Sequence, residues 1–413
     1  MTSETAPDVS ATVRWIQVSF IDVFGATNSV QIPGSRWRHA LDNGIIFDGS
    51  ALEGRARIFE SDMLLRPVEA TLVVSDGVGR AIGEVLTTAG QPWSGDPRTA
   101  LDSVVDRVGG LGDAWQATAE LEFYLFDGSG LPVDRGFYFD AVEGPGIDAV
   151  RSAAEALGHH GVEVHSCHHE AGPGQYEIDF GPLPAVPLAD ALTLAKQLIR
   201  EAATAKGLRA TFMARPIEGQ AGSGLHLHQT ADDELLDSSG VLTPTGRSFL
   251  AGQLYHAPAL MALGSPTVNS YKRLHGTGEA PTAAMWSHRH RAALIRVSSS
   301  GIEFRGSDPS ANPYLLIAGL LLAAASGVEE ERELVPPQDE SIGGFDATGD
   351  SVRYEPLPRT LDDALDALIA DDVIVDGLDD GLLRRLVDGR RAEASAYREH
   401  VTTWEIERYL DEA

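Results

Sequence analysis

Polar residues occur in pairs separated by one apolar residue at four places in this sequence. The pairs belong to the segments Glu120-Leu121-Glu122, Gln175-Tyr176-Glu177, His226-Leu227-His228 and Glu303-Phe304-Arg305. In a β-strand, residues two apart point to the same face, so both polar groups of a pair would share one side of a sheet. Buried charge is costly unless that face lines a polar cavity or binds ions. We therefore expect several strands to line one charged site.

The acidic side chains of these strands could bind metal ions. The candidate ligands are Glu120, Glu122, Glu170, Glu177 and Glu303, with His226 as the imidazole. Clustered carboxylates repel one another and raise each other's pKa unless cations are present. Carboxylate oxygens with a single imidazole suit Mg²⁺ or Mn²⁺ better than zinc. A solvated face would explain one Glu-X-Glu set, but four sets with strand spacing favour a site for divalent cations.

A group of arginines stands out against the acidic background of the chain. It comprises Arg273, Arg289, Arg291, Arg296 and Arg305. Guanidinium groups bind carboxylate and phosphoryl oxygens through paired N–H donors. Metals and arginines around a cleft are typical of phosphoryl transfer, whereas salt bridges to surface acids are the alternative explanation. The sequence contains no GxxxxGK[ST] loop and no kinase-type glycine loop, so a nucleotide would be held in another way.

The elements that must position these residues indicate an α+β fold. Alternating residues predict strands within 12–33, and a second strand-rich stretch at 70–85 precedes a turn cluster that ends near Pro97. Beyond it, strands at 114–126 and 175–180 mix with helices at 148–161 and 188–207. This order lacks the regular βαβ rhythm of a parallel sheet, which favours antiparallel pairing.

The sequence pattern of the last third of the chain predicts mainly helices. The apolar run 314–325 is too short to cross a bilayer and predicts a buried helix. Residues 328–357 are rich in acids and turn formers and predict a long surface excursion. Residues 360–413 are charged and predict helices.

Composition restricts the function further. The 413 residues include 61 Asp and Glu against 32 Lys and Arg, a net charge of -29, which makes nucleic acid a poor partner. The lone Cys167 excludes an internal disulfide framework and fits a reducing cytosol. A zinc site in Cys167-His168-His169-Glu170 is a weak alternative, because neighbouring strand residues point to opposite faces. The N-terminus shows no signal-peptide pattern, so we expect a cytoplasmic protein without membrane segments.

The segments that carry these residues resemble the glutamine synthetase family. In family order they are FDGSALEG, ESDMLLRP, AELEF, HHEAGPGQYEI, FMARP, GSGLHLH, NSYKRLHGTGEAP, HRHRAALIRV and IEFRGSDPSANPYL. The resemblance extends from about residue 15 to the terminal VTTWEIERYL. It implies a small β-grasp N-terminal domain at 12–97 and a catalytic domain at 98–413 with an antiparallel sheet flanked by helices. It also implies homo-oligomeric rings, usually a dodecamer of two stacked hexamers, with active sites shared between neighbours.

The resemblance further implies a role for each matching residue. Glu122, Glu170 and Glu177 would hold one divalent ion, and Glu120, His226 and Glu303 a second, with a third near the nucleotide phosphates. Gly222, Arg273 and Arg305 would bind the amino acid, and Tyr138 and Glu170 the ammonium. Arg291 and Arg296 would face the transferred phosphate, and His228 the nucleotide. Asp48 of the adjacent subunit would deprotonate the ammonium, and Glu279 would close the site as a flap.

The implied reaction is an ATP-dependent ligation with Mg²⁺ or Mn²⁺. The γ-carboxylate of glutamate would be phosphorylated and then form a γ-glutamyl amide with ammonia or a small organic amine. Departures from the family pattern occur at Ala51, Ala221, Ser298 and Gly301. Ala51 and Ala221 favour a larger amine, while Asp48, Tyr138 and Glu170 favour ammonia, and both acceptors remain open. Ser298 and Gly301 stand where basic residues are common, so an alternative is a weakly active paralogue that binds ligands or serves assembly.

Overall fold

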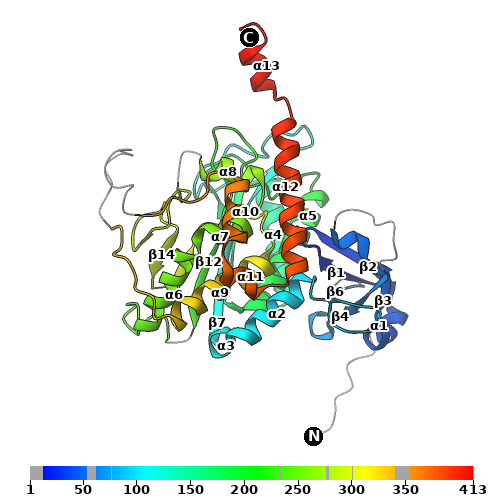
Figure 1. The fold of residues 1–413 in the computed structure, drawn as a ribbon. Helices are drawn as coiled ribbons and strands as arrows, with labels where there is room; N and C mark the ends of the chain where they lie inside the picture. The colour runs from blue at the N-terminus through cyan, green and yellow to red at the C-terminus, as the bar shows by residue number, and fades with distance from the viewer. Residues whose placement is uncertain are drawn as a thin grey trace.

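The computed structural model describes residues 13–53, 62–75, 77–231, 234–275, 279–299, 301–339 and 354–412. Two sheets organise this part of the chain. Figure 1 shows the N-terminal sheet, in blue, on one side of a larger body that contains the second sheet and most helices. The turn-rich segment after β6 ends where helix α2 begins at Pro97.

The N-terminal sheet has the strand order β2-β1-β6-β4-β3, with β5 paired to β6. Its strands are β1 (Trp15–Ile21), β2 (Thr27–Pro33), β3 (Ile45–Asp48), β4 (Asp62–Pro67), β5 (Val73–Ser75) and β6 (Val78–Leu86). Its helices are η2 (Gly34–Arg36), α1 (Trp37–Asn43), η3 (Gly49–Glu53) and η4 (Glu69–Thr71). Ile16, Val18 and Phe20 alternate along β1 and pack with Trp37 and Leu65 in a separate small core. The strands expected at 12–33 and 70–85 are therefore present.

The second sheet has the order β13-β14-β15-β12-β7-β9-β8, with β10 and β11 both paired to β7. Its strands are β7 (Trp115–Phe126), β8 (Val164–His169), β9 (Gln175–Phe180), β10 (Leu183–Pro184), β11 (Arg209–Thr211), β12 (Leu225–Ala231), β13 (Trp286–Ser287), β14 (Ile295–Ser298) and β15 (Gly301–Phe304). Antiparallel pairing holds throughout except between β13 and β14. In the N-terminal sheet, β1 and β6 are also parallel, because the long connection between them returns the chain in the same direction.

Helices make up most of the rest of the larger body. They are α2 (Pro97–Val108), α3 (Gly110–Ala114), α4 (Pro145–His159), α5 (Ala185–Ala205), α6 (Pro244–Tyr255), α7 (Ala257–Gly264), α8 (Val268–Leu274), α9 (Pro313–Glu329), α10 (Leu361–Ile369), α11 (Asp372–Gly377), α12 (Asp380–Glu399) and α13 (Thr403–Tyr409). Helix α9 is buried from Pro313 to Gly327, as its apolar run predicts. Among the described residues, no helix combines the length and apolar character needed to cross a membrane.

One face of the second sheet belongs to the main hydrophobic core. Leu121, Ile178, Leu225 and Leu227 are fully buried there, and α4 and α5 pack on the strands at this side. Because side chains alternate in a strand, the polar residues between these leucines and isoleucines lie on the opposite face. The fold therefore separates an apolar, helix-covered face from a polar face.

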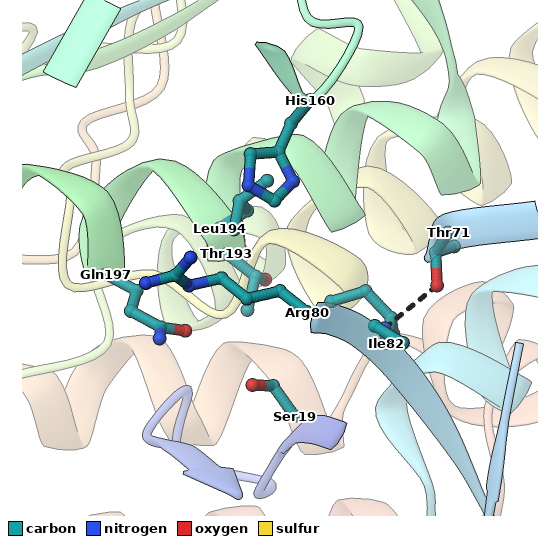
Figure 2. Close-up of a pocket in the computed structure, with 9 residues that line it drawn as sticks. Ser19, Thr71, Arg80, Ile82, His160, Thr193, Leu194 and Gln197 are labelled. Carbon is teal, nitrogen blue, oxygen red and sulfur yellow. Dashed lines mark hydrogen bonds between the residues drawn. The ribbon is translucent and has the colours of Figure 1, made fainter. Parts of the chain in front are cut away.

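The N-terminal sheet region contacts helices α9 and α5 of the larger body. The Asn312 amide donates to the carbonyl oxygen of Asp22 at 3.1 Å, and Arg80 Nη2 lies 2.8 Å from Glu201 Oε2. Figure 2 shows Arg80 directed towards Thr193 and Gln197 in a cavity between the N-terminal sheet and α5. This cavity of about 20 Å³ has room for a water molecule but not for a metabolite.

The C-terminus forms an arm. Helix α13 contains no buried residue, and Figure 1 shows it, in red, projecting beyond the end of α12. The predicted helices of 360–413 are thus present as α10 to α13. Of the surface excursion expected at 328–357, α9 occupies the first two residues and residues 340–353 lie outside the described part.

Candidate active site

Strand register brings the polar pairs together on one face of the second sheet. Central strand β7 lies between β12 and β9, so that Glu120 is opposite His226 and Glu122 is opposite Glu177. On the far side of β12, Glu303 lies opposite both His228 and Arg296. Four sequence segments that are far apart in the chain therefore contribute to one continuous row of charged groups.

Glu120 is the most strongly paired carboxylate of this row. Its two oxygens lie 2.8 Å from His226 Nδ1 and 2.8 Å from His228 Nε2. Burial alone would raise its pKa, but the hydrogen bonds from the two histidines outweigh burial and hold the pKa of Glu120 well below its usual range. The pKa of His228 is raised, because the bond to Glu120 and the charge of Glu303 outweigh burial.

Glu170 and Glu177 have too few cationic partners. Burial, followed by the charge of Glu122, raises the pKa of both Glu170 and Glu177. Gln175 Nε2 donates to Glu122 Oε2 at 2.9 Å, and His168 Nε2 lies 3.3 Å from Glu177 Oε1. These carboxyl groups would be ionised together only if cations were bound, which is the property expected of a metal site.

The donor set fits a hard divalent cation. Ligand atoms of Glu120, His228 and Glu303 all lie within 4.8 Å of one another. Glu303 is fully buried, and its Oε2 accepts no hydrogen bond from the described residues. Its only charged neighbour at this oxygen among the described residues is Arg296, in an ion pair without a hydrogen bond. A buried carboxylate oxygen that accepts no hydrogen bond, beside a second carboxylate and an imidazole, suits Mg²⁺ or Mn²⁺.

The compact group of Glu120, His228 and Glu303 differs from the predicted ligand set in its histidine. His226 was expected as the ligand and His228 as a nucleotide contact, yet both imidazoles contact Glu120, and His228 is the one in the compact group. A second compact group contains His168, Glu177 and Asp179. In the sequence, His168 is considered only as a zinc ligand, and Asp179 is not among the predicted ligands. Strand alternation could have found both, because each lies two residues from a predicted ligand, Glu170 and Glu177 respectively.

Arginines border the acidic row. Arg305 pairs with Glu303, and Arg296 Nη1 lies 3.3 Å from Glu303 Oε2. Arg273 is buried, and burial lowers its pKa. Its Nη1 has no hydrogen-bond partner among the described residues, which leaves a buried donor for a ligand carboxylate. A Cβ on Gly222 would lie 2.6 Å from Arg273 Cγ, so Gly222 permits this close packing.

More exposed groups lie at the edge of the site. Arg291 Nη1 is 3.4 Å from Glu279 Oε2 and 3.4 Å from the Tyr138 hydroxyl. Glu279 Oε2 is also 4.0 Å from Arg305 Nη2, which links this edge to the buried acids. Arg289 shows a different contact, its backbone N–H donating to Ser287 Oγ at 3.0 Å.

Asp48 is the predicted residue that the single chain does not bring to this site. It ends β3, the edge strand of the N-terminal sheet, on the side of the molecule away from β12 and β14 in Figure 1. Ser50 donates its N–H to Asp48 at 2.9 Å. The Ala51 side chain lies outside the described part.

The departures at Ala221 and Gly301 have local structural consequences. The Tyr124 hydroxyl donates to the carbonyl oxygen of Ala221 at 2.7 Å, which fixes the backbone beside Gly222. Gly301 has φ of 133°, and a Cβ there would lie 2.6 Å from the Gln229 carbonyl oxygen. A basic side chain at position 301 would therefore require β15 to shift.

Known proteins are similar to this chain in amino-acid sequence. The sequence model "Glutamine synthetase, beta-Grasp domain" matches residues 12–86, and "Glutamine synthetase, catalytic domain" matches residues 94–409. Glutamine synthetase of Thermus thermophilus is 38% identical, with 96% of each chain covered. That of Halobacterium salinarum is 36% identical, with 97% of this chain and 94% of the relative covered.

Solved structures are similar over the full length. A structure described as a GmaS/ADP complex has a TM-score of 0.87 and 28% identity, covering 98% of this chain and 99% of its own. Apo GmaS has a TM-score of 0.88 at 28% identity. The N-terminal sheet is thus a β-grasp domain beside a larger catalytic domain, as expected from the sequence. On these matches, the chain belongs to the glutamine synthetase family.

Proposed function

We propose that this chain is an ATP-dependent ligase that activates the γ-carboxylate of glutamate by phosphoryl transfer and joins it to an amine. The observation that carries this proposal is the row of buried carboxylates bordered by arginines on one sheet face of a glutamine synthetase fold. A carboxylate is a poor electrophile, so it must be activated before an amine can attack it. Binding ATP, a carboxylate substrate and cations together requires both signs of charge, which this face provides.

Divalent cations would be held by the acidic row. We assign Glu122, Glu170 and Glu177 to one ion and Glu120, Glu303 and a histidine to another, with two or three ions of Mg²⁺ or Mn²⁺ in total. His226 and His228 both remain candidates for the histidine ligand, since both contact Glu120. When bound, such ions neutralise phosphate charge and polarise the phosphoryl oxygens.

The chain's own residues would orient the substrates. Arg273 and Gly222 form the buried end of the amino-acid site, where the unpartnered Arg273 Nη1 suits the α-carboxylate of glutamate. Arg305 lies between this end and Glu303. Arg291 and Arg296 would face the transferred phosphate from the outer edge, and Glu279, paired with Arg291, would cover the site as a flap.

The acceptor amine would bind beside Tyr138 and Glu170. Its ammonium form must lose a proton before it can attack, which requires a general base in a site that excludes water. Asp48 has the required carboxylate but lies on the edge strand of the β-grasp domain. We therefore propose that Asp48 reaches the site of a neighbouring subunit.

This sharing of the site requires an oligomer, and we propose a ring assembly, most simply two stacked hexamers. Helix α13 and the residue after it support contacts between copies, because Trp404, Ile406 and Leu410 are exposed and belong to neither hydrophobic core of the described chain. We further propose domains of 12–97 and 98–413, with the boundary at the start of α2. A cytoplasmic location fits the use of ATP and the free thiol of Cys167.

Phosphate release tests the function directly. The protein is incubated with ATP, Mg²⁺ and glutamate, with ammonium, hydroxylamine or a primary amine as the acceptor. We expect phosphate release that depends on both glutamate and an acceptor, and a γ-glutamyl amide detected by mass spectrometry. If neither glutamate nor any other amino acid supports phosphate release with any acceptor, the ligase proposal is wrong and the non-catalytic alternative is favoured.

A further inference from the structure

Gln175 belongs to one of the four polar pairs of the sequence, yet the proposed function gives it no role. It begins β9 and lies opposite Tyr124 of β7, on the same sheet face as Glu122 and Glu177. Both Gln175 and Tyr124 are completely buried. The acidic row therefore ends in two buried neutral residues, and each of them needs hydrogen-bond partners inside the protein.

The side-chain amide of Gln175 uses both of its donors and its acceptor. Its Nε2 donates to Glu122 Oε2 at 2.9 Å and to the Gly222 carbonyl oxygen at 3.1 Å. Its Oε1 accepts from the Gly172 N–H at 2.8 Å. Because an amide has two N–H donors and one carbonyl oxygen, these partners fix its orientation. One side chain thus holds a predicted metal ligand and a residue assigned to glutamate binding.

Residues 221–224, here called the glycine segment, are also held by β7. The Tyr124 hydroxyl donates to the Ala221 carbonyl oxygen at 2.7 Å. The Glu122 N–H donates to the Gly224 carbonyl oxygen at 3.1 Å. The position of the glycine segment therefore depends on β7 and β9, the two strands that also carry the predicted metal ligands.

The space around the glycine segment is restricted as well. A Cβ on Gly224 would lie 2.4 Å from His226 Nε2 and 2.9 Å from Glu122 Oε1. It would also lie 3.0 Å from Arg273 Nη2. Because a packed interior transmits strain, a shift of the glycine segment would disturb both the metal ligands and Arg273.

We propose that Gln175 is a positioning residue that fixes Glu122 for metal binding and Gly222 for glutamate binding at the same time. This inference rests on the proposed ligase function. A hydrogen bond to a ligating carboxylate orients it, and loss of such an outer partner weakens metal binding. Gln175 engages Oε2 of Glu122 and leaves Oε1 for a cation. Tyr124 has a single O–H donor, which is used on Ala221, so it fixes the glycine segment alone.

Binding measurements on the full-length protein separate the two effects. Isothermal titration calorimetry gives the Mn²⁺ affinity without nucleotide, and the glutamate affinity with saturating Mn²⁺ and a non-hydrolysable ATP analogue. Gln175→Met keeps the side-chain length and removes the amide. We expect it to weaken Mn²⁺ binding by about tenfold or more and glutamate binding by about fivefold. Tyr124→Phe removes only the hydroxyl, so glutamate binding should weaken about threefold while the Mn²⁺ affinity is unchanged.

Gln197→Met is the matched control. Gln197 Nε2 on α5 donates to Glu201 Oε1 at 2.9 Å, so this variant loses a similar hydrogen bond outside the site and should bind both ligands normally. If Gln175→Met does not fold, Gln175→Glu takes its place, because it keeps the acceptor oxygen and the shape but loses both donors. It should weaken glutamate binding at least as much.

Unchanged affinity for either ligand in Gln175→Met, or for glutamate in Gln175→Glu, would overturn the proposal. An equal loss of Mn²⁺ affinity in Tyr124→Phe would also overturn it, because a general loosening of the site would then explain both variants. Neither affinity depends on turnover, so these outcomes are distinct from a failure of the ligase function. Failure of the unmodified protein to bind glutamate would contradict both the proposed function and this inference.

Discussion

Glu120 is the residue on which the charge balance of the site depends most. It receives hydrogen bonds from His226 and His228 and belongs to the compact group with Glu303. Its low pKa keeps it ionised, while Glu170 and Glu177 have raised pKa values. Glu120 is therefore compensated by imidazoles and Glu303 by arginines, whereas Glu170 and Glu177 need added cations to be ionised together.

The Glu120→Gln variant tests this assignment. Loss of a charged ligand should weaken Mn²⁺ binding by about tenfold or more, measured by isothermal titration calorimetry on the nucleotide-free protein. Glu155→Gln, on the exposed side of α4, is the control and should bind Mn²⁺ normally. Equal affinity in Glu120→Gln, with thermal unfolding like that of the unmodified protein, would remove Glu120 from the metal site.

At the scale of elements, helix α2 begins at a buried carboxyl group between the two domains. Asp96 accepts from the Thr99 N–H and hydroxyl and caps the helix. Burial is the largest influence and raises the pKa of Asp96 to about 6. The folded state therefore binds more protons than the unfolded state between about pH 4 and pH 6. The contribution of Asp96 to the free energy of unfolding is present at low pH and is lost as the pH rises through 6.

Asp96→Asn keeps a capping oxygen and cannot ionise. Relative to the unmodified protein, its free energy of unfolding should rise by about 2–3 kcal/mol between pH 4 and pH 7, measured by urea unfolding at fixed protein concentration. Asp237→Asn is the control. Hydrogen bonds from Ser239 and then Val241 lower the pKa of Asp237, so the effect of this variant should be constant over the same range. A constant effect of Asp96→Asn as well would contradict the raised pKa.

The elements were largely predictable, but their register was not. Alternation along 115–126 and 175–180 predicts β7 and β9, because a period of two is a local property of the chain. Which histidine lies opposite which glutamate depends on the strand order β15-β12-β7-β9, which arises from contacts between residues far apart in sequence. Spacing therefore indicated that His226 and His228 share a face, yet it could not show that both contact Glu120.

At the scale of the whole molecule, the acidic side chains fall into two groups. A few carboxylates are buried in the acidic row, and many others lie on the exposed faces of helices such as α10 and α12. The exposed acids favour solubility of a large assembly. The C-terminal arm is different, because Trp404 is 61% and Leu410 74% exposed. Apolar side chains on a projecting helix gain stability only by contact with another surface.

Removal of the arm tests its part in assembly. A chain that ends at Glu399 should sediment as smaller species than the full chain in analytical ultracentrifugation. The double variant Trp404→Ala with Leu410→Ala should also sediment as smaller species, because it deletes the apolar contacts and leaves the helix. Glu407→Ala, an exposed change on the same helix, is the control and should assemble normally. Unchanged sedimentation of both arm variants would refute this role.

The proposed function depends above all on one step, in which the γ-carboxylate of glutamate attacks ATP and is phosphorylated before the amine attacks it. Transfer of oxygen tests it most directly. The protein is supplied with ATP, Mg²⁺, an acceptor amine and glutamate labelled with ¹⁸O in the γ-carboxylate, and the phosphate released is analysed by mass spectrometry. Activation by phosphoryl transfer predicts one ¹⁸O atom from glutamate in each phosphate. Amide formation with unlabelled phosphate would contradict the account.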